Sequence, residues 1–312
     1  MRLKHRLSVV LLSGSVLFGP LGCAGAQTEQ IVSFRGALPA FTEIERVPFF
    51  PQERYYCGPA SLAMAMAWSG VAVMPDDLVT EVYTPGRQGT FAPDIVAAAR
   101  RNGRLAVEIR ELDDLLAELA AGHPAIVFQN LRLSVFPQWH FAVAIGYDLN
   151  ERQIILRSGT NRRLLMPLDA FENTWRRADY WALVVLPPEA APATPDPQRW
   201  LTAAAGLERA NRAEAAQLAY ETFLARWPEN RSAQLGRANA LFALSRFESA
   251  ERAYRDVVDG DPLMAEAWNN LAYALHRQGK RDEAVRAAER AVAVGGARIA
   301  DYADTLREVS SQ

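Results

Sequence analysis

The last third of this 312-residue chain is organised by a repeat of 34 residues. Four sets of equivalent positions are each spaced by 34 residues. The positions are Pro228 and Pro262; Ala216, Ala250 and Ala284; Trp200, Gln234 and Trp268; and Tyr220 and Tyr254. A period of this length indicates supersecondary units that cannot bury their apolar faces alone and must stack on their neighbours. The segment is therefore predicted to be an array of paired helices.

The layout of each unit resembles the tetratricopeptide repeat. A small residue stands at mid-repeat, an aromatic residue follows four positions later, and proline ends the unit. We expect about three repeats over residues 198–312, with residues 299–312 as a capping helix. The resemblance implies a concave surface that binds a protein partner.

A spacer, "PPEAAPATPDP" (187–197), precedes the repeats. Its Pro/Ala composition predicts an extended linker that cannot join a core and marks a domain boundary. Before it, residues 40–186 mix the two secondary structures. Helices are expected over 57–68, 76–83, 92–103 and 112–122, and strands over 124–130, 140–148, 153–159 and 180–188. Because the strands cluster behind the helices, the fold class of this front domain is predicted to be α+β.

Residues 1–26 have the pattern of a signal segment, with basic residues, an apolar stretch and then small residues. Two cleavage sites compete. "GPLGC" resembles a bacterial lipobox that would lipidate Cys23, although Pro20 stands where that motif usually has Leu. "AGA" fits an ordinary cut after Ala26. We favour the lipoprotein, in which Ala24 implies sorting to the outer membrane. Either site predicts a protein of the bacterial cell envelope or periplasm, lipid-anchored in the first case and soluble in the second.

Export leaves Cys57 without a partner, because Cys23 is the only other cysteine. This excludes an intramolecular disulfide, and a leftover thiol in an exported protein is a candidate reactive group. One cysteine also cannot supply the usual ligands of a zinc site built from cysteines, which is therefore excluded. No other metal and no cofactor are expected. With 34 basic and 36 acidic residues, the formal charge of −2 gives no electrostatic reason to expect nucleic acid as a partner.

Three residues could form a nucleophilic site. Cys57 opens "CGPASLAMAMAW", and a helix N-terminus favours the thiolate. Among the four histidines, elimination favours His140, which begins a strand, as the base. Gln52 lies five residues before the cysteine and could donate to an oxyanion. Simpler interpretations stay open at this point: a packed cysteine, a half-buried histidine and a solvated glutamine.

Together, "Q-x4-C-G-P-A-S" and "H-F-x-V-x-x-G-Y-D" resemble the C39-like, papain-fold cysteine peptidases over about residues 44–186. With the signal segment and repeats, the chain looks like a group of bacterial lipoproteins. The resemblance implies that Cys57 is the nucleophile, His140 the base and Gln52 the oxyanion-hole residue. The third residue of the catalytic set differs from the family pattern, since Ser158-Gly159 stands where the family has Asp-Pro. Asn161 is a candidate substitute, and Asp148 is expected to be a turn residue.

The expected function is that of a cysteine peptidase, which hydrolyses a polypeptide substrate while the repeats recruit a partner or substrate. Two alternatives remain. The same residues could transfer an acyl group to an amine, as an amidase or transglutaminase-like enzyme does. Alternatively, the missing Asp could indicate a catalytically weak or inactive scaffold that binds peptides.

Overall fold

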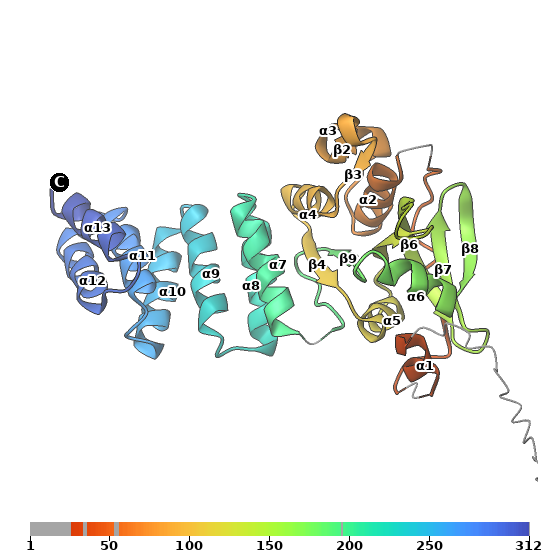
Figure 1. Ribbon diagram of the computed structural model, residues 1–312. Helices are drawn as coiled ribbons and strands as arrows, with labels where there is room; N and C mark the ends of the chain where they lie inside the picture. Colours follow the sequence, from red (N-terminus) through yellow and green to blue (C-terminus); the bar gives the residue numbers. More distant parts are fainter. Residues whose placement is uncertain (1–25, 34–35, 53–55, 195, 312) are drawn as a thin grey trace, which may run out of the picture.

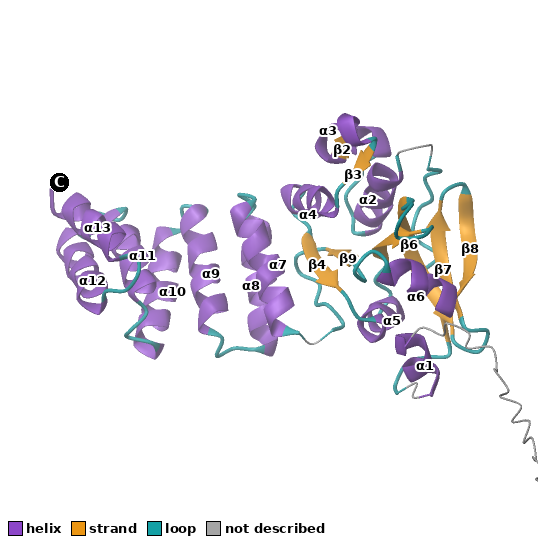
Figure 2. Cartoon of the chain, in the orientation of Figure 1, coloured by secondary structure: helices purple, strands orange, loops and turns teal. Residues whose placement is uncertain are grey.

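The computed structural model describes residues 26–33, 36–52, 56–194 and 196–311, and divides them into a mixed front half and an all-helical back half (Figures 1 and 2). The front half contains an antiparallel sheet with the strand order β4-β9-β5-β6-β7-β8, and β1 also pairs with β6. The strands are β1 (Phe41–Glu43), β4 (Leu105–Ile109), β5 (Ala125–Asn130), β6 (Trp139–Asp148), β7 (Gln153–Ser158), β8 (Asn161–Pro167) and β9 (Ala182–Leu186). A separate pair is formed by β2 (Tyr83–Thr84) and β3 (Gly89–Thr90). The α+β prediction is confirmed.

Helices cover both faces of the sheet. In the view of Figure 1, α2, α3 and α4 lie above it and α1 and α5 lie below it. The helices are α1 (Ala26–Ser33), α2 (Cys57–Trp68), α3 (Pro75–Val82), α4 (Ala92–Arg101), α5 (Leu112–Ala120) and α6 (Leu168–Arg176), with a 3-10 turn at Pro85–Arg87. Both α2 and α5 contact β6, and seven consecutive residues of this strand, 141–147, are therefore buried. Every predicted helix and strand of this half is present, and the additional elements are β1, β2, β3, β4, β8, α1, α6 and the 3-10 turn.

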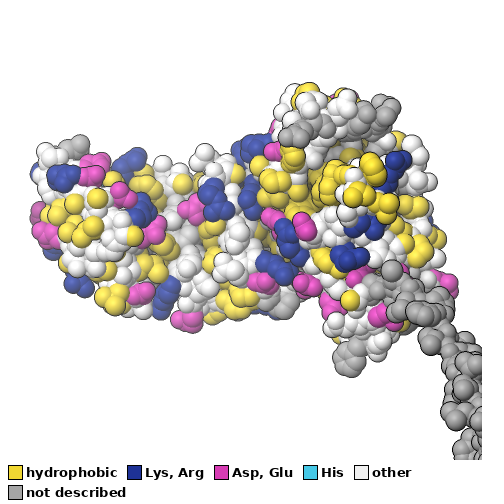
Figure 3. Space-filling view, viewed as in Figure 1, with side chains coloured by type: hydrophobic (Ala, Val, Ile, Leu, Met, Phe, Trp, Pro, Cys, Tyr) yellow, Lys and Arg dark blue, Asp and Glu magenta, His cyan; other side chains and the backbone are white. Residues whose placement is uncertain are grey.

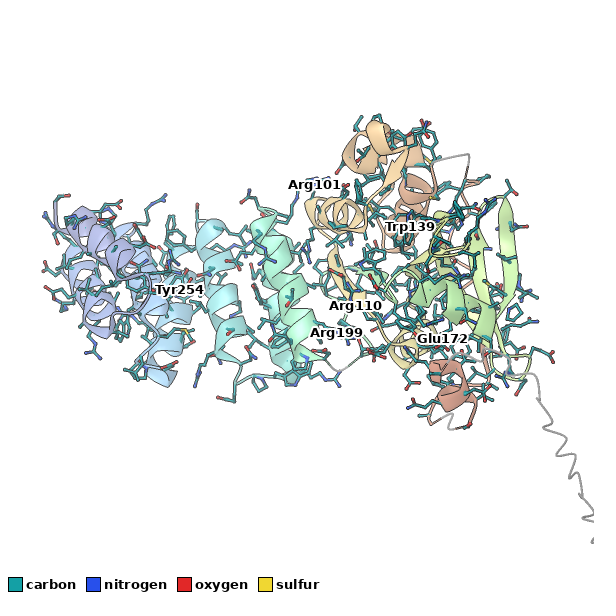
Figure 4. All side chains as sticks on the ribbon, viewed as in Figure 1. Arg101, Arg110, Trp139, Glu172, Arg199 and Tyr254 are labelled. Carbon is teal, nitrogen blue, oxygen red and sulfur yellow. The ribbon has the colours of Figure 1, made fainter. Side chains whose placement is uncertain are left out.

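The first helix belongs to the front domain although it begins at Ala26, the last residue of the predicted signal segment. The buried carboxylate of Glu172 accepts hydrogen bonds from the backbone N–H groups of Gln27 (3.1 Å) and Thr28 (2.7 Å). These are orphan donors at the start of α1. Figure 4 shows Glu172 beside this helix. Residues 1–25, including Cys23, lie outside the described residues.

The repeats form three helix pairs and a final helix, as predicted. They are α7 (Pro197–Arg209), α8 (Ala213–Arg226), α9 (Arg231–Ala243), α10 (Phe247–Gly260), α11 (Ala265–His276), α12 (Arg281–Val294) and α13 (Ile299–Ser311). The mid-repeat alanines Ala216, Ala250 and Ala284 are fully buried, which lets the paired helices approach closely.

The expectation that the linker cannot join a core is wrong. Residues 187–194 and 196 lack regular structure, but Thr194 is buried and its N–H and hydroxyl both donate to Glu118 at 3.0 Å. The apolar core of the front domain continues into α7 and α8 through residues such as Trp200 and Leu207. Proline-rich composition limits the backbone conformation, but it does not prevent a short segment from packing when buried partners satisfy its polar groups.

Polar contacts also join α7 to the front domain. Arg199 pairs with Asp114 of α5, and Figure 4 shows it between α7 and the sheet domain. Gly206 lies so close to Arg100 that an added Cβ would overlap the guanidinium group. The first repeat therefore packs directly against the front domain.

Replacement of Gly146 by Ala should destabilise the fold by about 1–3 kcal/mol, the usual range for overpacking. A Cβ at this position would lie 2.1 Å from the carbonyl oxygen of Thr42, which is backbone and cannot move aside as a flexible side chain can. Urea unfolding measures the change. Gly86→Ala is the control, because nothing lies within 4 Å of its Cβ position. Equal stability of the two variants would contradict the close contact between β1 and β6.

Glu118→Gln should lower the stability at pH 7 by about 1–3 kcal/mol, because it weakens a buried charge-assisted network. Burial alone would raise the pKa of Glu118, but hydrogen bonds from His123 and Thr194 outweigh it and hold the pKa below its ordinary value. The stabilisation is therefore present above the unfolded-state pKa of about 4.3 and is lost as pH falls through the folded-state pKa.

Thermal unfolding across pH tests this linkage. The stability gap between wild type and Glu118→Gln should begin to shrink as pH falls below the unfolded-state pKa of about 4.3, and it should close only below the folded-state pKa, where the carboxyl is protonated in both the folded and the unfolded protein. Glu189→Gln, an exposed change in the same linker, should leave the curve unchanged. A gap that is constant with pH would show that the Glu118 carboxylate does not hold the linker.

Candidate active site

Cys57 is the first residue of α2, as predicted, and follows the N-cap Tyr56. The hydrogen bond from the N–H of Ala60 to the carbonyl of Tyr56 is the first of the helix, and Pro59 has no N–H. The N–H groups of Cys57 and Gly58 are thus left to face the thiol. The residue after the cysteine must be small, because a Cβ on Gly58 would overlap the side chain of Thr90.

The thiol does not have the lowered pKa that its helix position suggested. Burial raises the pKa of Cys57, and the backbone amides of Phe141, Gly58 and Cys57 lower it by less. The expected stabilisation of the thiolate by the helix N-terminus is thus outweighed, because desolvation penalises the charged form more than the helix N-terminus stabilises it. The amide of Phe141 also places the thiol beside β6, next to His140 in the chain.

His140 lies near the start of β6, opposite Gln129 of β5 in the strand register. Its Nε2 lies 2.9 Å from the hydroxyl oxygen of Ser158, and burial lowers its pKa to about 4. The imidazole is thus neutral at pH 7. When Nε2 carries the proton and donates to Ser158, Nδ1 is the nitrogen left to accept one.

Ser158, rather than Asn161, partners the histidine. It ends β7 at a register shift, and Gly159 turns the chain with a φ of 59° into β8. Asn161 pairs with Ser158 across this hairpin, but its side chain is exposed. Asp148 is a turn residue, as expected, since its carboxylate accepts the N–H groups of Asn150 and Glu151.

Gln52 is buried and joins three segments of the site. Its Nε2 donates to the hydroxyl of Ser61 in α2 at 3.0 Å, and its Oε1 accepts the N–H of Gly159 at 2.9 Å. Its own backbone N–H donates to the carbonyl of Gly159, also at 2.9 Å. One of the two Nε2 hydrogens is used by Ser61, which leaves the other for a ligand. We name this set of bonds the Gln52 clasp.

Sequence reasoning missed the roles of Ser61, Gly159 and the Phe141 amide. The first two had a weak local signal, since a polar residue interrupts the apolar run of α2 and a glycine follows Ser158. The Phe141 amide had no signal, because backbone contacts depend on tertiary packing. Among the described residues, no three His, Cys, Asp or Glu side chains are grouped to hold a metal ion. Nor is any helix of the described residues long and apolar enough to cross a membrane.

Comparison with known proteins supports the two-part organisation. Residues 44–182 match the Peptidase C39 like family, and residues 201–254 and 235–303 match the tetratricopeptide repeat. No curated protein matches the chain.

Solved structures that are similar to part of this chain include the following three. A protein described as a C39-like peptidase from Bacillus anthracis is 19% identical, with a TM-score of 0.42, covering 47% of this chain and 98% of its own. A double glycine motif protease from an AMS/PCAT transporter, in complex with its leader peptide, is 22% identical, with a TM-score of 0.35, covering 46% and 96%. The MamA RS-1 ArsTM double mutant is 16% identical, with a TM-score of 0.31, covering 37% and 76%.

The family matches agree with the antiparallel sheet domain and with the helix pairs that follow it. They confirm the resemblance that the Gln52, Cys57 and His140 motifs indicated. The chain combines a domain of the C39-like peptidase family, at residues 44–182, with a tetratricopeptide-repeat array at residues 201–303.

Proposed function

We propose that this protein is a cysteine peptidase that hydrolyses peptide bonds of a polypeptide substrate, with Cys57 as nucleophile and His140 as base. The observation that carries the proposal is the 2.9 Å contact between His140 Nε2 and the Ser158 hydroxyl. It directs the opposite nitrogen to proton transfer, as the third member of a triad does. The Phe141 amide, which interacts with the thiol, keeps Cys57 beside this strand.

The raised pKa of Cys57 and the lowered pKa of His140 favour a neutral resting pair. The thiol proton would then move to His140 Nδ1 as Sγ attacks the substrate carbonyl carbon. The imidazolium returns this proton to the leaving amine, and the C–N bond breaks to give a thioester. Water, activated by the same imidazole, hydrolyses the thioester and restores the thiol.

Charge that develops on the carbonyl oxygen would be stabilised by two donors, the free N–H of the Gln52 amide and the backbone N–H of Cys57. The Gln52 clasp favours this role, because donors that are held in place before the reaction need not reorganise. Such a donor is worth about 10²–10³ in rate.

The repeats would recruit the substrate or a second protein. A cavity of about 190 Å³ lies among Asn239, Phe242, Tyr254, Asn270 and Tyr273, which belong to the three successive helices α9, α10 and α11. Asn239 Oδ1 accepts from Tyr254 (2.8 Å) and Asn270 (3.0 Å). A row of amides and aromatic rings suits a polypeptide ligand, which offers both backbone amides and apolar side chains.

The location remains part of the proposal. The pattern of residues 1–26 supports export to the bacterial envelope, with lipid attached to Cys23 if the lipobox is used. Mass spectrometry of the mature N-terminus distinguishes a diacylglyceryl Cys23 from a free Gln27.

A peptide-based, thiol-directed probe tests the Cys–His pair. Wild type should be labelled about 10²–10⁴ times faster than His140→Ala, the usual contribution of a general base, and Cys57→Ala should not be labelled. His276→Ala, the same change in the repeats, is the control and should label as wild type does.

Equal labelling of wild type and His140→Ala would contradict the proposal and favour the scaffold, which the replacement of Asp by Ser158 also suggests. Labelling without cleavage of a peptide library, but with transfer to added amines, would instead identify an acyl transferase.

Ser158→Asp should shift the acid limb of the kcat/KM profile upward. A carboxylate beside Nε2 stabilises the imidazolium, so the pKa of His140 should rise from about 4 by about 1–3 units. Activity requires neutral His140 in the free enzyme and is lost as pH falls through this pKa, so the loss should begin at a higher pH than in wild type. Ser158→Ala is the control and should lower kcat/KM without an upward shift. An unmoved acid limb in Ser158→Asp would exclude Ser158 as the residue that orients His140.

A further inference from the structure

The loop between β5 and β6 exposes several large apolar side chains next to the candidate site. We define Leu131–Trp139 as the apolar hairpin. The exposed fractions are 39% for Leu131, 68% for Leu133, 76% for Val135, 75% for Phe136 and 51% for Trp139. No other stretch of this length among the described residues exposes as many large hydrophobic side chains. Figure 4 labels Trp139 on the sheet domain, and Figure 3 shows a patch of hydrophobic atoms on the visible face of that domain.

Backbone hydrogen bonds hold the hairpin in this conformation. The buried side chain of Asn130 accepts the N–H groups of Arg132 (3.1 Å) and Gln138 (2.9 Å). The N–H of Leu131 donates to the carbonyl of Gln138 at 2.9 Å, and the N–H of Phe136 donates to that of Leu133 at 3.0 Å. The exposure of the apolar side chains is therefore built into the backbone of the loop.

The degree of exposure distinguishes a projecting tip from the wall of a groove. Side chains that line a groove are partly covered by the opposite wall. Leu133, Val135 and Phe136 are instead each exposed by about two thirds or more, so a partner must surround them to bury them. The hydrocarbon boundary of a lipid bilayer can do so without a preformed complementary shape.

The charges of the hairpin agree with a lipid partner of negative charge. Arg132 is the only charged residue between Leu131 and Trp139. Arg177 adds a second guanidinium at the base of the loop, where its Nε donates to the carbonyl of Asn130 at 3.2 Å. Trp139 stacks on Phe128 at a centroid distance of 5.2 Å. Apolar side chains at a tip, with tryptophan and arginine behind them, match the order of layers at an anionic membrane surface.

We propose that the apolar hairpin inserts into the interfacial layer of a membrane that contains anionic lipid. The insertion places the adjoining His140 and Cys57 at the membrane surface and gives them access to polypeptides held there. This goes beyond the proposed peptidase function and does not depend on it, because the inserting residues are separate from the Cys–His–Ser set.

Vesicle co-sedimentation tests the proposal. The protein is used without residues 1–25, whose apolar stretch would bind lipid by itself; every contact described above is made by residues 26–311. The double variant Val135→Asp/Phe136→Asp should bind phosphatidylcholine/phosphatidylglycerol vesicles at least about tenfold more weakly than wild type, because it removes apolar burial and adds repulsion. Leu263→Asp is the matched control, since this leucine is 77% exposed on a loop of the repeats, and its binding should equal that of wild type.

Further measurements distinguish membrane insertion from the alternative, a peptide-binding surface. Binding of the wild-type protein should weaken in high salt and on vesicles of phosphatidylcholine alone. Cys57→Ala should bind vesicles as wild type does, so a failure of the membrane proposal can be told apart from a failure of the peptidase proposal. Circular dichroism and thermal unfolding confirm that the double variant is folded. Equal binding by wild type and the folded double variant overturns the proposal. Absence of wild-type binding, together with a raised KM of the double variant for peptides, also overturns it and identifies a peptide-binding surface.

Discussion

The candidate site depends on one buried amide. The Gln52 clasp connects the loop before the nucleophile, the helix that begins at Cys57, and the turn after Ser158. Because each end of the amide makes a hydrogen bond inside the protein, the three segments are fixed relative to one another. Ser158 in turn holds His140. A single side chain therefore relates the proposed oxyanion donor, nucleophile and base.

Burial shifts the pKa values of the two proposed catalytic groups in opposite directions. It raises the pKa of Cys57 and lowers that of His140, so both groups favour their neutral forms. A carboxylate at position 158 would offset the desolvation of the histidine, but a serine hydroxyl orients the ring without supplying charge. The departure from the family pattern thus has a physical consequence. In the proposed peptidase reaction, the proton would therefore move during attack rather than before it.

The repeat array is attached to the front domain by a continuous core. The linker packs on α5 through the contacts of Thr194 with Glu118, and α7 lies against β4. Burial of the first repeat on the sheet domain gives the array a defined direction, which Figure 1 shows as an extension away from the sheet. A ligand held by the repeats would be presented from one side of the C39-like domain.

The sequence by itself determined the features that depend on local pattern. The 34-residue step predicted the helix pairs, and the apolar run after Cys57 predicted a buried helix that begins at this residue. Tertiary structure decided what depends on contacts between distant segments. It chose Ser158 over Asn161 as the partner of His140, packed a linker that composition suggested would stay extended, and reversed the expected direction of the Cys57 pKa. The physical reason is that burial and long-range hydrogen bonds set these properties, and neither is encoded by neighbours in the chain.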